Sequence, residues 1–584
     1  MNLKRFLPIL DWLPQYSKKQ LGGDLSAGIT VGVMLIPQGM AYALIAGLPP
    51  VYGLYGAIVP QLIYVLFGTS RQLAVGPVAM DSLLVASGVG LMATEGTDTY
   101  IALAIMLAGT MGLIQVVLGL ARMGFVTNLL SKPVISGFTS AAAIIIGLNQ
   151  LKYLLGVDLE KTSKVYKILW NAIQALDQTH LVTLALGIGG IIIIKGAKKI
   201  HKSIPGALVA VVIGIIVVYA FRLDQSGVSI VREIPEGLPA VKLQDFTIES
   251  WLELLPLAVT IAIVAYMEAY SVSKSIEAKV RTYKVSANQE LIALGMSNMI
   301  GSLFQSYPVT GGFSRSAVNY QSGANTPITS VFSALIVGFT LLFLTPLFYY
   351  LPHAILAAVI LVAVSSLIDI NYAIKLYKCS RWEFTLLLIT FLVTLNFSMV
   401  PGIVTGIILS ILTLLFKLAY PHIAELGRLK GHHEFRNIKR FKNLETWDDL
   451  LILRLDASLT FINIQYFKEY IEEKLRESEV SIKYVIVNAS AISYLDASAS
   501  QGLRDLLEFL KEQNVEFLIS DIKGPVRDMM YRTGINDLVT IDHLFIDLNE
   551  AVKFATTQER DSFKDYALQA NEKRPNVFEN ITKK

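Results

Sequence analysis

Cysteine and charge are scarce in this chain of 584 residues. It has one cysteine, Cys379, and 16% of its residues are charged, whereas soluble domains carry about 25%. A single cysteine excludes an internal disulfide and any metal centre built from several cysteines. The net charge of +4 is too small to indicate nucleic-acid binding. The phosphate-binding pattern GxxxxGK[ST] is also missing, so the sequence does not support ATP-driven transport.

The charge is distributed unevenly along the chain. Residues 421–584 carry 23 Lys and Arg against 27 Asp and Glu, whereas residues 1–420 carry 27 against 19. The longer part is therefore poor in charge, and the shorter part has the composition of a soluble domain. The division predicts these parts: an N-terminal segment (1–20), a membrane body (21–420), a linker (421–439), a soluble domain (440–556) and an exposed tail (557–584).

The body is rich in apolar runs. A membrane-spanning helix needs about 20 mostly apolar residues, and several runs approach or reach that length: 102–121, 134–149, 181–195, 204–221, 252–270, 327–350, 353–368, 383–399 and 402–419. The first hydrophobic stretch begins near Gly22 and has no small-residue cleavage site, so we interpret it as a span, not a signal peptide.

Basic clusters predict the orientation of the body. They occur at 195–202, 274–284 and 375–381, and loops rich in Lys and Arg tend to face the cytoplasm. The loop near 94–99 and the acidic stretch at 223–250 are then external. This pattern places the N-terminus and the soluble domain in the cytoplasm, which requires an even number of spans.

Two segments inside the body are interrupted by proline and glycine. One is LAVGPVAMDSL (73–83) and the other is SYPVTGGFSRSA (306–317). Paired breaks in the two halves of a membrane protein indicate a transport site, because irregular backbone at membrane depth must line a cavity or be buried in protein. The helix after each break offers free N–H groups to an anion. Gly76, Gly311 and Gly312 are predicted to let a ligand approach, and Ser314 and Ser316 to add hydroxyl donors.

Three charged residues lie in or beside these apolar segments. Charge within a span indicates function. Glu268 is a candidate proton carrier, with a structural pair with Arg315 as the alternative. Arg315 either attracts the anion or neutralises Glu268 or Asp81. Asp81, when ionised, would repel a bound anion, so we leave open whether it points away, pairs with Arg315, is protonated or holds a cation.

Three motifs resemble the sulfate permease (SulP) family, namely PQGMAYALIAGLPPVYGLY (37–55), LAVGPVAMDSLL (73–84) and PVTGGFSRSAVNYQSGANT (308–326). The resemblance implies an α-helical membrane protein with 14 transmembrane segments in two inverted seven-segment repeats, forming UraA-like core and gate domains. It also implies an elevator-type mechanism, a homodimer and proton coupling at Glu268. The implied anion-binding residues are Gln38, Tyr42, Val78, Ala79, Met80, Phe313, Ser314 and Arg315, with Asp81 as a secondary candidate.

The soluble part alternates β-rich runs with an amphipathic helix. Strands are predicted within 450–461, 480–490 and 515–522, and a helix over 499–514. This α/β pattern resembles a STAS domain, whose signature loop corresponds to 493–506. Ala497 follows Asp496 where the related anti-sigma factor antagonists carry a phosphorylated serine, so a phosphorylation switch is not expected. We expect Ser498 to cap the helix.

Together these features predict a secondary active transporter of the plasma (inner) membrane, not an enzyme, that imports sulfate with protons. The alternatives are sodium-coupled bicarbonate transport, dicarboxylate transport, an uncoupled anion channel and an anion-sensing receptor. The expected partners are an inorganic anion, a proton or sodium ion, the lipid bilayer, a second copy of the chain and an unidentified ligand of the STAS domain. No cofactor, metal or nucleic acid is expected.

Overall fold

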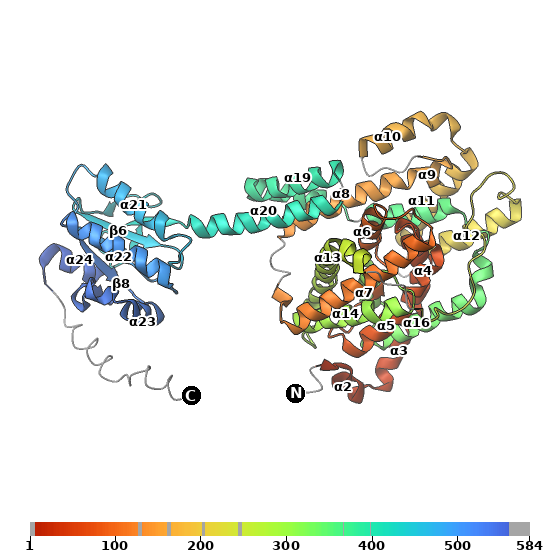
Figure 1. The fold of residues 1–584 in the computed structure, drawn as a ribbon, viewed down its shortest axis with the longest axis horizontal. Helices are drawn as coiled ribbons and strands as arrows, with labels where there is room; N and C mark the ends of the chain where they lie inside the picture. The colour runs from red at the N-terminus through yellow and green to blue at the C-terminus, as the bar shows by residue number, and fades with distance from the viewer. Residues whose placement is uncertain are drawn as a thin grey trace. The chain divides into compact units, whose positions relative to one another are not determined.

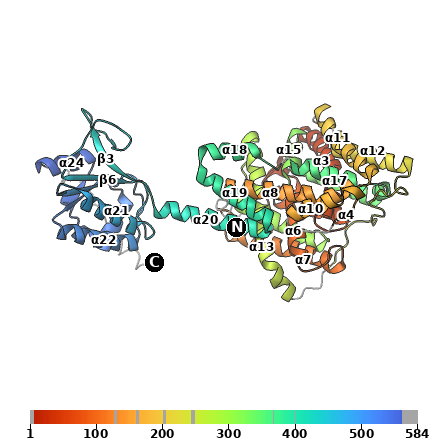
Figure 2. The same cartoon turned by 90° about the horizontal axis from the view of Figure 1, so that it is seen from above.

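The computed structural model describes residues 6–125, 131–159, 165–200, 205–242, 248–365, 367–397 and 399–559. It divides into two compact units, Met1–Ser410 and Ile411–Lys584, which Figures 1 and 2 show in two views. Parts of several predicted segments lie outside the described residues. They are residues 1–5 of the N-terminal segment, the end of the basic cluster at 195–202, the first residue of the apolar run at 204–221, residues 243–247 of the acidic stretch, single residues of the runs at 353–368 and 383–399, and residues 560–584 of the tail.

The first unit is almost entirely helical. Its α-helices are α2 (Ile9–Trp12), α3 (Lys18–Ile45), α4 (Pro50–Tyr55), α5 (Val59–Phe67), α6 (Ala79–Val89), α7 (Asp98–Leu120), α8 (Lys132–Asn149), α9 (Leu151–Leu155), α10 (Val165–Gln174), α11 (Leu181–Ile200), α12 (Gly206–Phe221), α13 (Ile248–Val280), α14 (Ala287–Leu303), α15 (Phe313–Gln321), α16 (Ile328–Phe339), α17 (His353–Ser365), α18 (Ile370–Cys379) and α19 (Arg381–Asn396). The last apolar helix, α20 (Met399–Ala419), contains the division between the units.

Length and composition make many of these helices candidate membrane spans. Within the described part of the chain, eight helical segments are long and apolar enough to cross a bilayer, from Lys18–Ile45 to Val400–Ala419. Three shorter apolar helices, Ala79–Val89, Leu181–Ala197 and Gly206–Phe221, accompany them. Each of them is shorter than the roughly 20 residues of a full span.

Small residues bring the inner helices together. Figure 1 shows α7, α13 and α14 packed side by side. A Cβ atom built on Gly112 of α7 would lie 2.6 Å from the carbonyl oxygen of Gly295 on α14, and one on Gly295 would lie 2.6 Å from the carbonyl oxygen of Gly112. Reciprocal glycines of this kind let the two backbones approach closely, as helices in membranes commonly do.

The second unit is an α/β domain. Its strands are β3 (Ile423–Leu429), β4 (Phe435–Asn437), β5 (Leu444–Glu445), β6 (Leu450–Leu455), β7 (Tyr484–Asn488), β8 (Glu516–Ser520) and β9 (Leu544–Phe545). They form a sheet in the order β4-β3-β6-β7-β8-β9, with β5 also on β3. β6 to β9 run parallel, with Leu451 opposite Val485 and Val485 opposite Phe517. Its helices are α21 (Ile464–Glu477), α22 (Ala497–Glu512), α23 (Gly524–Thr533) and α24 (Leu548–Thr557).

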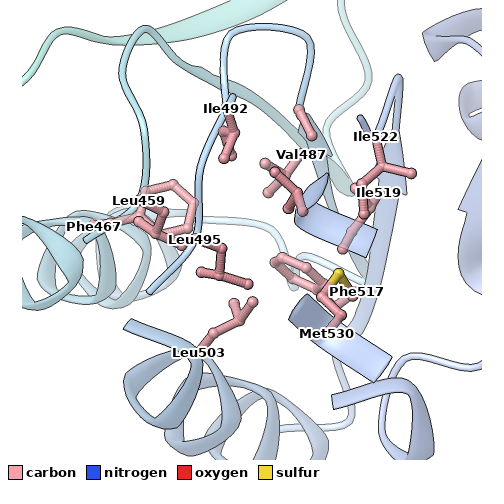
Figure 3. Close-up of a pocket in the computed structure, with 12 residues that line it drawn as sticks. Leu459, Phe467, Val487, Ile492, Leu495, Leu503, Phe517, Ile519, Ile522 and Met530 are labelled. Atoms are coloured by element: carbon pink, nitrogen blue, oxygen red, sulfur yellow. The ribbon is translucent and has the colours of Figure 1, made fainter. Parts of the chain in front are cut away.

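Alternating side chains bury both faces of this sheet. Leu453, Val487 and Phe517 point into one core with α21, α22 and α23, while Ile452, Ile486 and Leu518 point into the other with α24. Figure 3 shows that the first core contains a small cavity lined only by apolar side chains. The predicted strands and helix are therefore present, with β6, β7, α22 and β8 inside or overlapping the expected ranges.

Candidate functional site

Both predicted breaks are present, and they pair with each other. Each break holds a two-residue strand, β1 (Val75–Gly76) and β2 (Thr310–Gly311), followed by the short helix α6 or α15. The strands are antiparallel, with Val75 opposite Gly311 and Gly76 opposite Thr310. The backbone N–H of Gly312 also donates to the carbonyl of Ala74 at 3.1 Å. The two halves of the membrane unit thus meet at the starts of these helices.

Each helix start leaves its first N–H groups available. Val78 precedes α6 and Gly312 precedes α15 in extended conformation, and no side chain caps either helix. The first intrahelical bonds are those from Ser82 to Val78 and from Ser316 to Gly312, so the preceding N–H groups have no acceptor within the helix. Two uncapped helix starts provide donors and partial positive charge for an anion.

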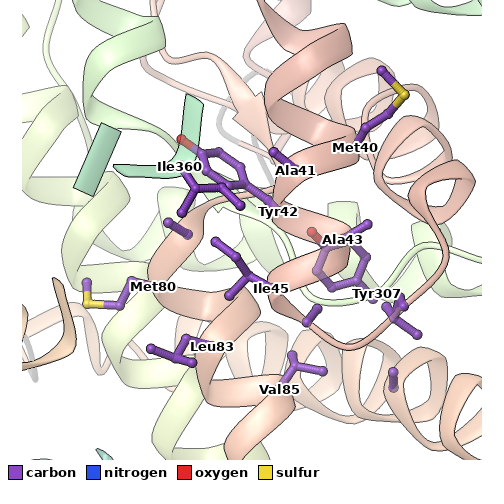
Figure 4. Close-up of a cluster of buried hydrophobic side chains, with 14 of the residues drawn as sticks. Met40, Ala41, Tyr42, Ala43, Ile45, Met80, Leu83, Val85, Tyr307 and Ile360 are labelled. Atoms are coloured by element: carbon purple, nitrogen blue, oxygen red, sulfur yellow. The ribbon is translucent and has the colours of Figure 1, made fainter. Parts of the chain in front are cut away.

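A cavity of about 280 Å³ lies at this point. Nine of the ten predicted site residues line it: Gln38, Tyr42, Val78, Ala79, Met80, Glu268, Phe313, Ser314 and Arg315. They come from four elements, α3, α13 and the starts of α6 and α15. Figure 4 shows Tyr42, Met80 and Tyr307 among the buried apolar side chains that surround this region. The tenth residue, Asp81, is not part of the lining.

Helix α3 contributes one polar face to the cavity. Gln38 and Tyr42 line it together with Thr30 and Met34, and the spacing of four residues places all four on the same side of the helix. Pro37 lies inside α3 and cannot donate a hydrogen bond to the preceding turn. Sequence reasoning missed Thr30 and Met34, although the spacing from Gln38 would have identified them.

Arg315 and Glu268 bring opposite charges to the cavity without forming an ion pair. They interact electrostatically, but no described ion pair within 4.0 Å includes Arg315. Nε and Nη2 of Arg315 and Oε2 of Glu268 are buried without hydrogen-bond partners among the described residues. Buried polar groups are normally hydrogen-bonded, so these atoms keep hydrogen-bonding capacity that the described residues do not use.

The glycines and serines of the second break divide between packing and the cavity. A Cβ atom on Gly312 would lie 2.9 Å from Cζ of Arg315, and one on Gly311 would lie 2.5 Å from a methyl carbon of Leu73. Both glycines therefore make room for protein side chains, and Gly312 also lines the cavity, as predicted. Ser316 donates to the carbonyl of Gly312 at 2.7 Å and accepts from the N–H of Ala74 at 2.9 Å. Ser316 thus connects the two breaks, while Ser314 lines the cavity.

A second part of the cavity wall is mostly apolar. It is formed by side chains of α11, α12 and α17 and by residues just beside these helices: Ile194, Pro205, Gly206, Ala207, Val359, Val362, Ala363 and Leu367. The sequence did not indicate these residues, because apolar residues in membrane helices give no sign of whether they face lipid, protein or a cavity. The site therefore has one polar wall and one apolar wall.

The signature loop of the second unit contradicts one prediction. Asp496, not Ser498, caps α22, because its side chain accepts from the N–H of Ala499 at 2.7 Å. Its other carboxylate oxygen accepts from the N–H of Phe461 at 2.9 Å. Aspartate accepts both bonds without needing a proton, and Ser498 lies inside the first turn of the helix.

A second acidic residue of this unit sits at the end of β6. Burial raises the pKa of Asp456, but hydrogen bonds from Arg454 and His422 outweigh that effect and hold the pKa below its ordinary value. The ionised carboxylate of Asp456 therefore connects the end of β6 to His422, directly before β3. Among the described residues, no group of three or more His, Cys, Asp or Glu is arranged to hold a metal ion.

Comparison with known proteins defines the class. Residues 21–390 match the sulfate permease family, and residues 442–551 match the STAS domain. The chain therefore belongs to the sulfate permease family. It is a multi-pass membrane transporter of an inorganic anion, and not an enzyme. This confirms the predicted family, the helical membrane fold and the STAS domain, whereas the count of 14 segments in two inverted repeats stays a prediction.

Individual relatives extend this likeness over nearly the whole chain. Sulfate transporter 4.1, chloroplastic, from Arabidopsis thaliana is 38% identical over 568 residues, covering 94% of this chain and 82% of that protein. The murine Solute Carrier 26 family member A9 anion transporter, solved in the inward-facing state, is 25% identical with a TM-score of 0.86 and covers 94% of both chains. The transmembrane domain of the cyanobacterial bicarbonate transporter BicA is 25% identical with a TM-score of 0.59, over 68% of this chain and 98% of that domain.

Proposed function

We propose that this protein imports sulfate together with protons. The observation that carries the proposal is the composition of the cavity: two uncapped helix starts, the unpartnered nitrogens of Arg315 and the unpartnered Oε2 of Glu268 face one space. The donors suit a tetrahedral oxyanion. The relatives named as sulfate transporters support the choice of sulfate.

Proton coupling follows from the charge of the substrate. A dianion that enters a negatively charged interior must overcome about 2.3 kcal/mol per elementary charge at 100 mV. Glu268 is the candidate carrier, because protonation removes a negative charge beside the bound anion. Binding of the anion and of the proton would then favour each other, as thermodynamic linkage requires.

The two walls of the cavity support an elevator mechanism. All the polar groups proposed to bind the anion lie on α3, α6, α13 and α15, and the facing wall from α11, α12 and α17 offers mainly aliphatic side chains. A polar wall can slide past an aliphatic wall without breaking hydrogen bonds between them. We assign α3, α6, α13 and α15 to the moving body and α11, α12 and α17 to the fixed body.

The remaining assignments follow from the sequence. We propose a transport domain over 21–420, a linker over 421–439 and a STAS domain over 440–556, between the N-terminal segment and the tail at 557–584. The STAS domain and the N-terminus would lie in the cytoplasm, with the body in the plasma membrane as a homodimer. A regulatory ligand of the STAS domain, of unknown identity, completes this proposal.

The test is uptake of labelled sulfate into proteoliposomes with an imposed inward proton gradient. Wild-type protein should accumulate sulfate in response to the gradient. In Glu268→Gln, the sulfate uptake stimulated by the gradient should be lower than in wild type by about tenfold or more. Glu253→Gln is the matched control, since Glu253 is exposed on the same helix and does not line the cavity. Uptake driven by the gradient to the same extent in both variants would contradict proton coupling at Glu268.

The choice of anion is tested in the same vesicles. Absence of sulfate uptake under every gradient would contradict the sulfate assignment. Bicarbonate uptake that requires sodium and ignores the proton gradient would instead support the sodium-coupled alternative.

A further inference from the structure

One buried carboxyl group has no role in the mechanism proposed above. Asp81 lies in the first turn of α6, directly after Met80 in the cavity wall, and is 0% exposed. Neither carboxyl oxygen has a hydrogen-bond partner among the described residues. Two other wholly buried carboxyl groups of this unit are well satisfied: Asp24 accepts three hydrogen bonds and Glu290 accepts four.

The elements around α6 do not neutralise Asp81. Helices α3, α7, α8 and α13 pack against α6. Of the charged groups on them, Glu268 of α13 acts on Asp81, and it carries the same sign. Tyr307 also interacts electrostatically with Asp81. Its hydroxyl, however, is hydrogen-bonded to that of Ser82 at 3.0 Å. No charged group of α7 or α8, among the described residues, acts on it.

The guanidinium of Arg315 does not neutralise Asp81 either. Its electrostatic partners are Tyr42, Glu268 and Tyr307, and Asp81 is not among them. Among the described residues, Asp81 therefore interacts with the carboxyl group of Glu268 in the cavity wall, whereas Arg315 interacts with Glu268 and not with Asp81. An ionised Asp81 would be a buried charge without a partner, which proteins avoid by neutralising the group.

We propose that Asp81 is a second proton-binding group of the anion site and carries a proton when the anion is bound. This inference rests on the proton-coupled transport proposed above and adds a second proton to it. When Asp81 and Glu268 are both ionised, the three charged groups sum to a net negative charge, which opposes an anion at the start of α6. A proton on each carboxyl leaves the positive charge of Arg315 in excess. Protonation of Asp81 and binding of the anion therefore favour each other.

A proton suits Asp81 better than a metal cation does. Metal cations bound by carboxylates require several oxygen ligands around them. Both oxygens of Asp81 lack polar partners, and the described residues provide no group of three or more metal-binding side chains. A proton needs a single oxygen atom.

The number of protons taken up with sulfate tests this inference. Purified full-length protein is mixed with sulfate in weakly buffered solution containing a pH indicator, and sulfate affinity is measured across a pH series. Each linked proton lowers the affinity about tenfold per pH unit once its group is ionised in the free protein. Wild-type protein should approach about a 100-fold loss per unit at the high end of the series, and Asp81→Asn about a tenfold loss. Asp81→Asn should also take up about one proton fewer per sulfate.

Further variants separate the two carboxyl groups. Glu268→Gln should still take up a proton with sulfate, and the double variant Glu268→Gln/Asp81→Asn should take up none. Asp81→Glu, which keeps the carboxyl, should restore the wild-type slope. Asp24→Asn is the matched control, because Asp24 is a buried aspartate of the same unit outside the cavity lining, and its proton uptake should equal that of wild type.

The failures of the two proposals are distinguishable. Sulfate binding with the same proton uptake and the same pH slope in Asp81→Asn and wild type would overturn the role of Asp81 alone. If Asp81→Asn does not fold, Glu268→Gln decides: absence of proton uptake with sulfate in that variant would also overturn it. Absence of sulfate binding by wild-type protein would overturn the proposed function itself.

Discussion

Gly312 has a steric role at the proposed anion site. Its φ of −79° and ψ of 128° are allowed for any residue, so backbone conformation does not demand glycine there. A Cβ atom there would lie 2.9 Å from Cζ of Arg315, at the far end of a flexible side chain, so an alanine would move the guanidinium. The absence of a side chain at Gly312 thus leaves room for the guanidinium of Arg315, the one cation among the described lining residues.

Substitution of Gly312 by alanine should displace that guanidinium. Overpacking of this kind costs about 1–3 kcal/mol, and we expect sulfate affinity to fall about tenfold, measured as the KM of uptake at fixed pH. Gly22→Ala is the control, because a Cβ atom on Gly22 meets nothing within 4 Å. Equal KM values for Gly312→Ala and wild type would show that Arg315 does not need this position.

Elements β1 and β2 hold the two short helices together, and Ser316 reinforces them. Its hydroxyl oxygen accepts from the N–H of Ala74, which is buried. Ser316→Ala leaves that N–H without a partner, and a buried unsatisfied donor costs about 1–3 kcal/mol. We expect a lower midpoint of thermal unfolding for the membrane unit in detergent.

A second buried serine provides the comparison for Ser316. Ser273 of α13 is also wholly buried, but its hydroxyl has no hydrogen-bond partner among the described residues. Ser273→Ala removes the same atom without breaking a bond, so it should be neutral or slightly stabilising. Equal destabilisation by the two substitutions would contradict the link between the breaks.

The sequence predicted these elements unevenly, for physical reasons. Proline and glycine in apolar surroundings mark both breaks, and charge in an apolar run marks Glu268 and Arg315. Pairing of β1 with β2 could not be predicted, because a two-residue strand is too short for its sequence to indicate which distant strand it will pair with. The apolar part of the cavity wall, which contains Val359, could not be predicted either, because an apolar residue in a membrane helix does not indicate what it faces. The cap of α22 was assigned to the wrong residue because Ser498 and Asp496 are both good N-cap residues.

At the scale of the whole molecule, the single cysteine offers a test of orientation. Cys379 is exposed at the end of α18, within the basic cluster at 375–381. The distribution of basic residues predicts that this cluster and the STAS domain share the cytoplasmic side. A membrane-impermeant maleimide should therefore label wild-type protein in inverted vesicles but not in intact cells.

Two variants complete the orientation test. Cys379→Ser should remain unlabelled in both preparations. Asn514→Cys in that background places a cysteine at an exposed position of the STAS domain, and it should be labelled from the same side as Cys379. Labelling of Cys379 from outside intact cells would contradict the predicted topology.

The pairing of the two breaks also constrains how the protein is made. Ala74 and Ser316 lie 242 positions apart, so the first break is synthesised and enters the membrane long before its partner exists. Backbone groups at membrane depth require hydrogen-bond partners, and those of β1 are supplied by β2. The first half of the chain must therefore wait, with its break shielded by water or by the insertion machinery, until the second half arrives. Completion of the proposed anion site is then a late event in biogenesis, reached only after α15 has been made.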